Sequence, residues 1–317
     1  MTFILREENL TLFFEYLEGK YELFAPVSET QHEAHFEKVA AKYVAFNPRL
    51  SPQGPKKFIF PYKRELFLGP GKKDKALVGL HFSDIAGIAI LDKVFKYPII
   101  DQEYFDVREQ FLIVGMDHFT APKDGYDLYL QVIDDYFLVT VGSPLGLKLA
   151  GTPLLIKNSK ITSEKNLFHF DDILSHKRLS EAVEKSYGSK IWDDLSQRCF
   201  GCGICSYVCP TCYCFDVQDS FDLKGNSTRT RCWDSCMLSA FTEIGGGFNF
   251  RPELKKRIYN WYYHKFVRMP KEYGKLGCVG CSRCIVYCPA RINYLEVLED
   301  VVLEMEGKRG KKPLRVK

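Results

Sequence analysis

The residues with the clearest chemical capability are the cysteines, because all twelve of them lie between Cys199 and Cys288. Eight of the twelve form two copies of the spacing C-x2-C-x2-C-x3-C-P. The copies consist of Cys199, Cys202, Cys205, Cys209 and Pro210, and of Cys278, Cys281, Cys284, Cys288 and Pro289. In bacterial-type ferredoxins this spacing supplies three thiolates to one [4Fe-4S] cluster, and the fourth thiolate binds the cluster of the other copy. The sequence therefore predicts two such clusters.

The crossed arrangement assigns the ligands of each cluster. We expect the first cluster to be bound by Cys199, Cys202, Cys205 and Cys288. We expect the second cluster to be bound by Cys278, Cys281, Cys284 and Cys209. Glycines beside both runs allow short loops to turn their N–H groups toward the sulfides. Zinc and disulfides are the alternatives, but zinc sites use pairs of C-x2-C units, and disulfides are rare in a reducing compartment.

Four further cysteines lie between the two runs, and four is the number that one more metal centre needs. They are Cys212, Cys214, Cys232 and Cys236. We interpret them as ligands of a third [4Fe-4S] cluster, which would extend an electron path. A tetrahedral zinc site is the alternative, because it would use the same four thiolates. Unligated core cysteines are the third option.

Helices are expected to frame these cysteines. Pro252 stands where a first-turn proline belongs, and apolar residues recur at helical spacing through residues 253–266. Residues 292–305 repeat that pattern after the second run. We therefore predict a mainly helical, ferredoxin-like iron-sulfur domain over residues 171–317.

The first 170 residues contain no cysteine and show signals of both helix and strand. Residues 10–27 predict a helix that ends near Gly19 and is followed by a strand, and residues 83–95 predict another helix that is capped by Ser83 or Asp84. Runs of β-branched and aromatic residues predict strands over residues 75–82, 109–117, 126–134 and 135–142. We expect a mixed α/β domain over residues 1–170, so that the chain as a whole is α+β.

The chain offers little chemistry outside its cysteines. The segment Gly69–Lys73 resembles the end of a phosphate-binding loop, but it lacks the upstream glycine spacing and the Ser or Thr of that motif. We therefore expect no catalytic residue, and we expect the first domain to be an adaptor that docks a partner. A net charge of +4 is too small to indicate binding to nucleic acid.

No transmembrane segment is expected, because the sequence contains no run of about 18 apolar residues. Arg6, Glu7 and Glu8 also interrupt the region where a signal peptide would be apolar. The sequence therefore predicts a cytoplasmic protein.

Four segments together carry a resemblance to a known family. They are residues 55–70, 199–217, 231–236 and 251–292. The chain resembles the iron-sulfur subunit shared by anaerobic sulfite reductases and by the NAD(P)-linked nickel-iron sulfhydrogenases, where it is the beta subunit. The resemblance implies that the chain transfers electrons and links a flavin-containing NAD(P)H-oxidoreductase subunit with a catalytic hydrogenase or sulfite/sulfur reductase subunit. An iron-sulfur binding module with structural or redox-sensing clusters is the alternative.

The sequence departs from that family in its first domain. Members often carry cysteines there, in segments that resemble Gly79–Asp84 and Met116–Thr120 of this chain. Neither segment contains a cysteine here. Any function of those cysteines in relatives is therefore absent from this chain.

Overall fold

The computed structural model describes residues 1–28, 34–47, 50–158 and 176–308. Contacts divide the chain into two compact units. We call the first the sheet unit, which comprises Met1–Pro61 and Phe67–Phe168. We call the second the cysteine unit, which comprises Tyr62–Leu66 and His169–Lys317. The domain boundary expected at residue 170 lies outside the described residues.

Eight strands of the described residues form the sheet of the first unit, in the order β3-β2-β5-β6-β7-β8-β1-β9. The central pairs β2–β5, β5–β6 and β6–β7 are parallel, and the outer pairs are antiparallel. The strands are β1 (Thr2–Arg6), β2 (Glu22–Ser28), β3 (Ala34–Lys38), β5 (Lys75–Leu80), β6 (Phe111–Asp117), β7 (Leu128–Ile133), β8 (Tyr136–Val141) and β9 (Ile156–Lys157). The strands expected from the sequence are thus confirmed as β2 and as β5 to β8.

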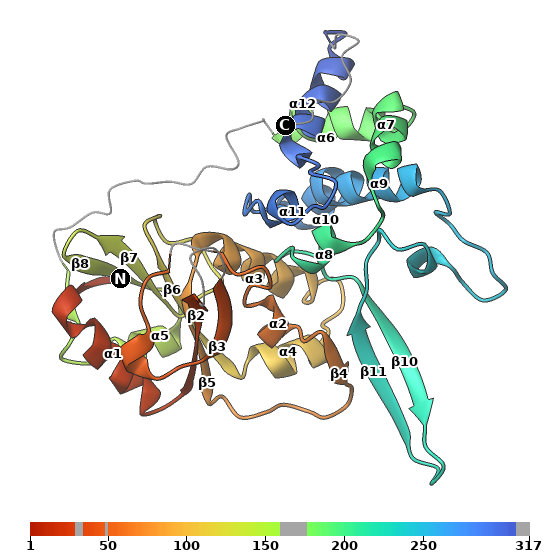
Figure 1. The fold of residues 1–317 in the computed structure, drawn as a ribbon. Coiled ribbons are helices and arrows are strands. Elements are labelled where there is room, and N and C mark those ends of the chain that lie inside the picture. The colour runs from red at the N-terminus through yellow and green to blue at the C-terminus, as the bar shows by residue number, and fades with distance from the viewer. Residues whose placement is uncertain (29–33, 48–49, 159–175, 309–317) are drawn as a thin grey trace. The chain divides into compact units, whose positions relative to one another are not determined.

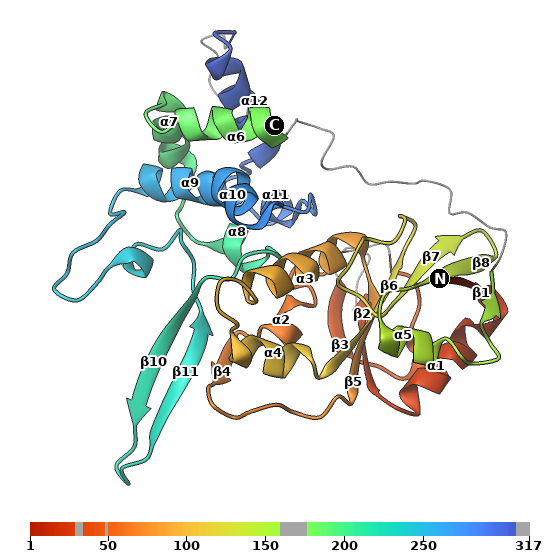
Figure 2. The same ribbon diagram turned by 180° about the vertical axis from the view of Figure 1, so that it is seen from behind.

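Helices cover both faces of this sheet, as Figures 1 and 2 show. Alternate residues of β6, such as Val114 and Met116, share a buried core with α1 and α5. On the opposite face, Gly115 lies so close to Ile85 of α3 that a Cβ would stand 2.4 Å from its Cδ1. The helices are η1 (Glu7–Asn9), α1 (Leu10–Glu18), η2 (Ala41–Tyr43), α2 (Lys56–Ile59), α3 (Phe82–Val94), α4 (Gln102–Arg108) and α5 (Pro144–Leu149).

The cap expected for α3 is wrong. The helix begins at Phe82, so Ser83 and Asp84 lie inside its first turn rather than ahead of it. A residue far away in the sequence takes the capping role, because the carboxylate of Asp117 accepts a hydrogen bond from the Phe82 amide at 2.9 Å. A cap supplied by another strand leaves no local sequence signal.

The cysteine unit is mainly helical. Its core joins α6, α7, α9 and α12, with Trp192, Trp261 and Phe266 among the buried side chains. Its helices are α6 (His176–Lys185), α7 (Lys190–Arg198), α8 (Ile204–Tyr207), η4 (Ala240–Thr242), α9 (Leu254–Tyr263), η5 (His264–Arg268), α10 (Met269–Tyr273), α11 (Arg283–Val286) and α12 (Tyr294–Met305). The helices expected over residues 253–266 and 292–305 are present as α9 with η5 and as α12. However, η5 is a π-helical turn, which the sequence did not indicate.

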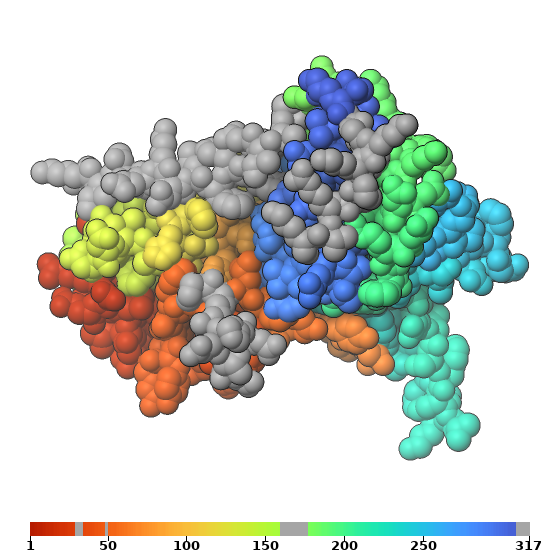
Figure 3. All heavy atoms as spheres, turned by 45° about the horizontal axis from the view of Figure 1, so that its top comes forward, coloured from red at the N-terminus to blue at the C-terminus, as the bar shows by residue number. Residues whose placement is uncertain are grey.

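This unit also has a small sheet of three antiparallel strands in the order β10-β11-β4. Strands β10 (Phe215–Phe221) and β11 (Ser227–Trp233) form a hairpin, which projects as a narrow arm in Figure 3. Strand β4 (Lys63–Glu65) comes from the first part of the sequence and pairs with β11. The α+β class is therefore confirmed, and the helical half contains β-structure that was not expected.

Candidate iron-sulfur centre

The first run of cysteines lies on a short loop between two helices. Helix α7 ends next to Cys199, and α8 carries Cys205. Between them the backbone adopts positive φ at Gly201 (63°) and at Gly203 (79°). At Gly203 a Cβ would also stand 2.9 Å from the side chain of Ser235. Only glycine fits both positions without strain, so the loop can curl tightly enough to bring its three thiols together.

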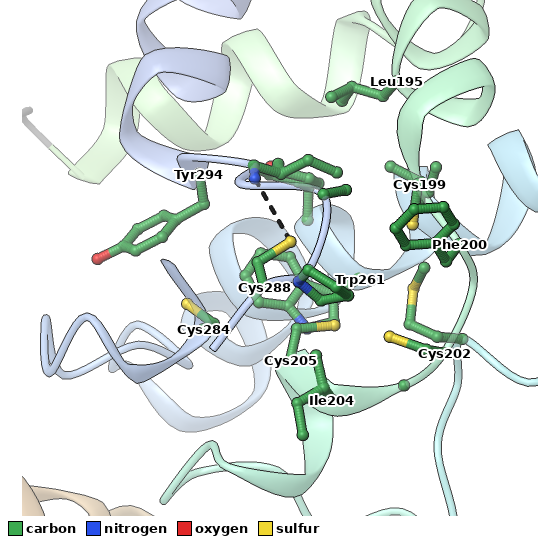
Figure 4. Close-up of a pocket in the computed structure, with 17 residues that line it drawn as sticks. Leu195, Cys199, Phe200, Cys202, Ile204, Cys205, Trp261, Cys284, Cys288 and Tyr294 are labelled. Carbon is green, nitrogen blue, oxygen red and sulfur yellow. Dashed lines mark hydrogen bonds between the residues drawn. The ribbon is translucent and has the colours of Figure 1, made fainter. Parts of the chain in front are cut away.

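These three thiols and Cys288 line one cavity, which Figure 4 shows. Its empty volume is about 610 Å³, part of which is open to solvent. Apolar and aromatic side chains, including Ile258, Trp261 and Tyr262, complete the lining. Cys284 of the second run also lines this cavity. Five thiols thus line one largely apolar space, and the three of the first run with Cys288 are the donor set that a four-iron cluster needs, so these residues fit the group.

Two backbone amides of the first site donate hydrogen bonds to its sulfur atoms, whereas burial favours the neutral thiol at Cys205. The amide of Gly201 donates to Cys199 Sγ at 3.4 Å, and the amide of Ile292 donates to Cys288 Sγ at 3.4 Å. Burial raises the pKa of the Cys205 thiol to about 12. Since iron binds the thiolate, metal binding must displace this proton.

The second run places its thiols around Cys209. The strongest electrostatic neighbours of the Cys284 thiol are Cys209, Cys278 and Cys281. The loop again requires positive φ, at Gly280 (69°) and at Ser282 (60°). The structure thus brings Cys209 from the first run to the second set, as it brings Cys288 to the first.

Three of the four remaining cysteines, Cys212, Cys214 and Cys236, lie near one another, because Cys214 is an electrostatic neighbour of both Cys212 and Cys236. The contacts given for the described residues do not link Cys232 with them. The Cys214 thiol is hydrogen-bonded to Cys236, and the Cys212 thiol is hydrogen-bonded to Cys209. The thiol of Cys232 points instead toward Gln218 Oε1, at 3.9 Å. Among the described residues, no three His, Cys, Asp or Glu side chains converge closely enough to hold a single metal ion.

One polar pair of the sheet unit was not assigned any role from the sequence. His81 Nδ1 lies 3.4 Å from Asp117 Oδ2, and both side chains are buried. His81 directly follows strand β5, and Asp117 is the last residue of the adjacent parallel strand β6. Their spacing in the sequence gave no sign of this contact.

A second missed residue lies among the cysteines. Lys265, in the π-helical turn η5, is buried, and its ammonium lies 3.2 Å from Cys209 Sγ. In the sequence, Lys265 is one of several lysines in a helical pattern, and nothing there indicated that it is buried beside a cysteine.

Comparison with known proteins identifies the class of protein to which this chain belongs. A family model described as a 4Fe-4S dicluster domain matches residues 198–292, which include all twelve cysteines. The chain is therefore an iron-sulfur protein with a 4Fe-4S dicluster domain over these residues. No solved structure matches it.

The relative found among curated proteins is the sulfhydrogenase 2 subunit beta of Pyrococcus furiosus. It is 34% identical over 260 residues, which cover 75% of this chain and 77% of the relative. The chain belongs to the family of sulfhydrogenase beta iron-sulfur subunits. None of the helices that the structure describes is both long and apolar enough to cross a membrane.

Proposed function

We propose that this chain relays single electrons and so links a flavin-containing NAD(P)H-oxidoreductase subunit with a catalytic hydrogenase or sulfite/sulfur reductase subunit. When bound, [4Fe-4S] clusters accept and release one electron at a time. The protein's own residues supply the rest, since they bind, space and shield the clusters. The observation that supports the proposal is the position of two thiols: Cys288 lines the cavity with the thiols of the first run, and Cys209 lies beside Cys284 of the second run.

The proposed ligands follow these positions. The first cluster takes four of the five thiols that line the cavity, Cys199, Cys202, Cys205 and Cys288. The second takes Cys284 and its three electrostatic neighbours, Cys278, Cys281 and Cys209. Sharing of ligands between runs holds the two clusters close together, as electron transfer between them requires. Cys212, Cys214, Cys232 and Cys236 are proposed to bind a third [4Fe-4S] cluster, with zinc as the alternative occupant.

The partners are inferred from the relative, whose name states that it is a subunit of a sulfhydrogenase. Among the described residues, the cavity of the first site is lined by thiols and by apolar and aromatic side chains, with no Asp, Glu, His, Lys or Arg. We therefore assign the catalytic step and the oxidation of NAD(P)H to other subunits. The sheet unit is proposed to be an adaptor that docks one of them.

The proposal is tested with the full chain prepared anaerobically with iron and sulfide. A flavoprotein that oxidises NAD(P)H should bleach the visible absorption of the protein, and an added one-electron acceptor should restore it. Cys288→Ser should remove about four irons per chain, because it removes a ligand of one cluster only. Colourless, sulfide-free wild-type protein would refute the proposal. Clusters that no electron donor reduces reversibly would instead favour a structural role.

A further inference from the structure

Lys265 is an unusual residue to find at the centre of this unit. Its side chain is only 3% exposed. Moving a lysine ammonium out of water is costly unless charged or strongly polar groups surround it. The groups around the Lys265 ammonium therefore indicate the charge of the group that this site binds.

The ammonium of Lys265 is fully engaged by three acceptors. It donates to Cys209 Sγ at 3.2 Å, to Thr211 Oγ1 at 3.1 Å and to the carbonyl of Gly277 at 2.8 Å. These are the three hydrogen bonds that an ammonium can donate. Cys209 belongs to the first run and Gly277 precedes the second, so Lys265 links the two parts of the proposed second site.

The charges that face Lys265 are thiols. Its strongest electrostatic neighbours are Cys209, Cys212 and Cys278. A salt bridge to a carboxylate would neutralise the lysine, whereas thiols do so only as thiolates. The positive charge of buried Lys265 therefore requires negative charge on the sulfur atoms around it. A cluster bound by four thiolates would provide that negative charge.

The backbone holds Lys265 in this position. The π-helical turn η5 adds a residue to the helix at this point, as is frequent at functional sites. The amide of Gly277 donates to the Lys265 carbonyl at 2.8 Å. A Cβ at Gly277 would stand 2.9 Å from the Lys265 Cα. Backbone and side chain therefore fix the ammonium against Cys209.

The first site has no equivalent contact among the described residues. The cation that acts on the Cys199 thiol is Arg257. Its guanidinium donates to the carbonyls of Met237, Arg251 and Pro252 instead of to a thiol. Lys265 also acts on Cys205, but without a hydrogen bond to it. Among the described residues, a cation thus donates a hydrogen bond to a thiol of the second site but not to a thiol of the first.

On these grounds, and resting on the proposed function, we propose that Lys265 raises the reduction potential of the second cluster relative to the first. A cluster gains negative charge when it is reduced, so a fixed cation stabilises the reduced form more than the oxidised form. Reduction adds one electron to the cluster, and Lys265 keeps its proton throughout. An electron that enters the chain then settles preferentially at the second site.

The test is a redox titration of the full chain, prepared anaerobically with its clusters and followed by electron paramagnetic resonance. In Lys265→Met, one midpoint potential should fall so that the ratio of reduced to oxidised cluster drops at least tenfold, or about 59 mV. The other midpoints should move less. Lys265→Arg keeps the charge and should retain the wild-type potentials.

The matched control is Lys255→Met, which removes a half-exposed lysine of α9 that is bound to Asp193 at 2.9 Å. It should leave all midpoints unchanged. If Lys265→Met loses iron, Lys265→Gln carries the same test, because it removes the charge but keeps a hydrogen-bond donor. Unchanged midpoints in an iron-replete neutral variant would overturn the inference, as would an equal fall in every midpoint. Wild-type protein without reducible clusters would instead refute the proposed function.

Discussion

At the scale of single residues, polar side chains pack around the cysteines together with apolar ones, as the contacts of Lys265 and Thr211 with Cys209 show. His264 precedes Lys265 and forms a hydrogen bond at 2.9 Å between its Nε2 and the hydroxyl of Tyr213. Burial, with further contributions from the neighbouring charges of Lys265, Arg268 and Arg251, lowers the pKa of His264 to about 4. The imidazole is therefore neutral in the folded protein at neutral pH.

This shift predicts a loss of stability in mild acid. Below about pH 6.5 the unfolded chain takes up a proton at His264, whereas the folded chain does so only near pH 4. Stability should thus fall as the pH drops through this window, by about 2 kcal/mol between pH 7 and pH 5. His264→Gln should remove that part of the pH dependence when anaerobic melting temperatures are compared.

Tyr213→Phe is the matched control for this experiment, because it removes the hydrogen bond but keeps the aromatic ring that buries His264. It should retain the pH dependence of the wild type. If His264→Gln and wild-type protein lose stability equally between pH 7 and pH 5, protonation of His264 is not the cause.

At the scale of elements, the second run is positioned by a close backbone contact. Gly277 is packed so tightly that a Cβ would stand 2.4 Å from Met269 Sδ. Gly277→Ala should therefore lower the free energy of unfolding by about 1–3 kcal/mol and reduce the iron content, since overpacking displaces the loop that carries Cys278. Melting temperature and iron analysis provide the measurements.

The control is Gly245→Ala, at a position where no atom of the described residues would lie within 4 Å of the added Cβ. Both substitutions add one methyl group to the same unit. Equal effects of the two variants would contradict the claim that packing at Gly277 positions the second run.

Elements with a regular pattern could be predicted from the sequence, and elements without one could not. The helix α12 and strands β5 to β8 bury one face or an apolar run, which leaves a clear periodicity. Strand β10 is exposed at six successive positions, so it shows no alternation of polar and apolar residues. The π-helical turn η5 continues the apolar spacing of α9 and cannot be distinguished from it by pattern.

At the scale of the whole molecule, the metal count decides how many centres the chain holds. Three [4Fe-4S] clusters predict about 12 irons per chain, whereas two clusters and a zinc site predict about 8 irons and one zinc. On the first expectation, Cys236→Ala should lower the iron content by about four. Elemental and sulfide analysis of anaerobic protein provides the measurement.

Ser206→Ala is the control for the third centre, because it removes a hydroxyl 4.0 Å from Cys236 Sγ without removing a thiol. It should keep the wild-type iron content. An unchanged iron content in Cys236→Ala, accompanied by loss of zinc, would replace the third cluster with a zinc site.

The candidate site could be predicted only as far as its covalent ligands. Ligand spacing is local, so the sequence revealed both runs of cysteines. The environment of the ligands is assembled from distant segments, as the contact of Lys265 with Cys209 illustrates across 56 positions of sequence. No pattern within a single segment encodes such a contact.

Strand β4 has a consequence for how the chain is made. Residues 63–65 leave the ribosome long before Thr230, Arg231 and Cys232, with which they pair. The hydrogen bonds of this strand therefore wait until most of the polypeptide has been synthesised. A gene fragment that starts after the sheet unit would encode every cysteine and still lack one strand of the layer beside them.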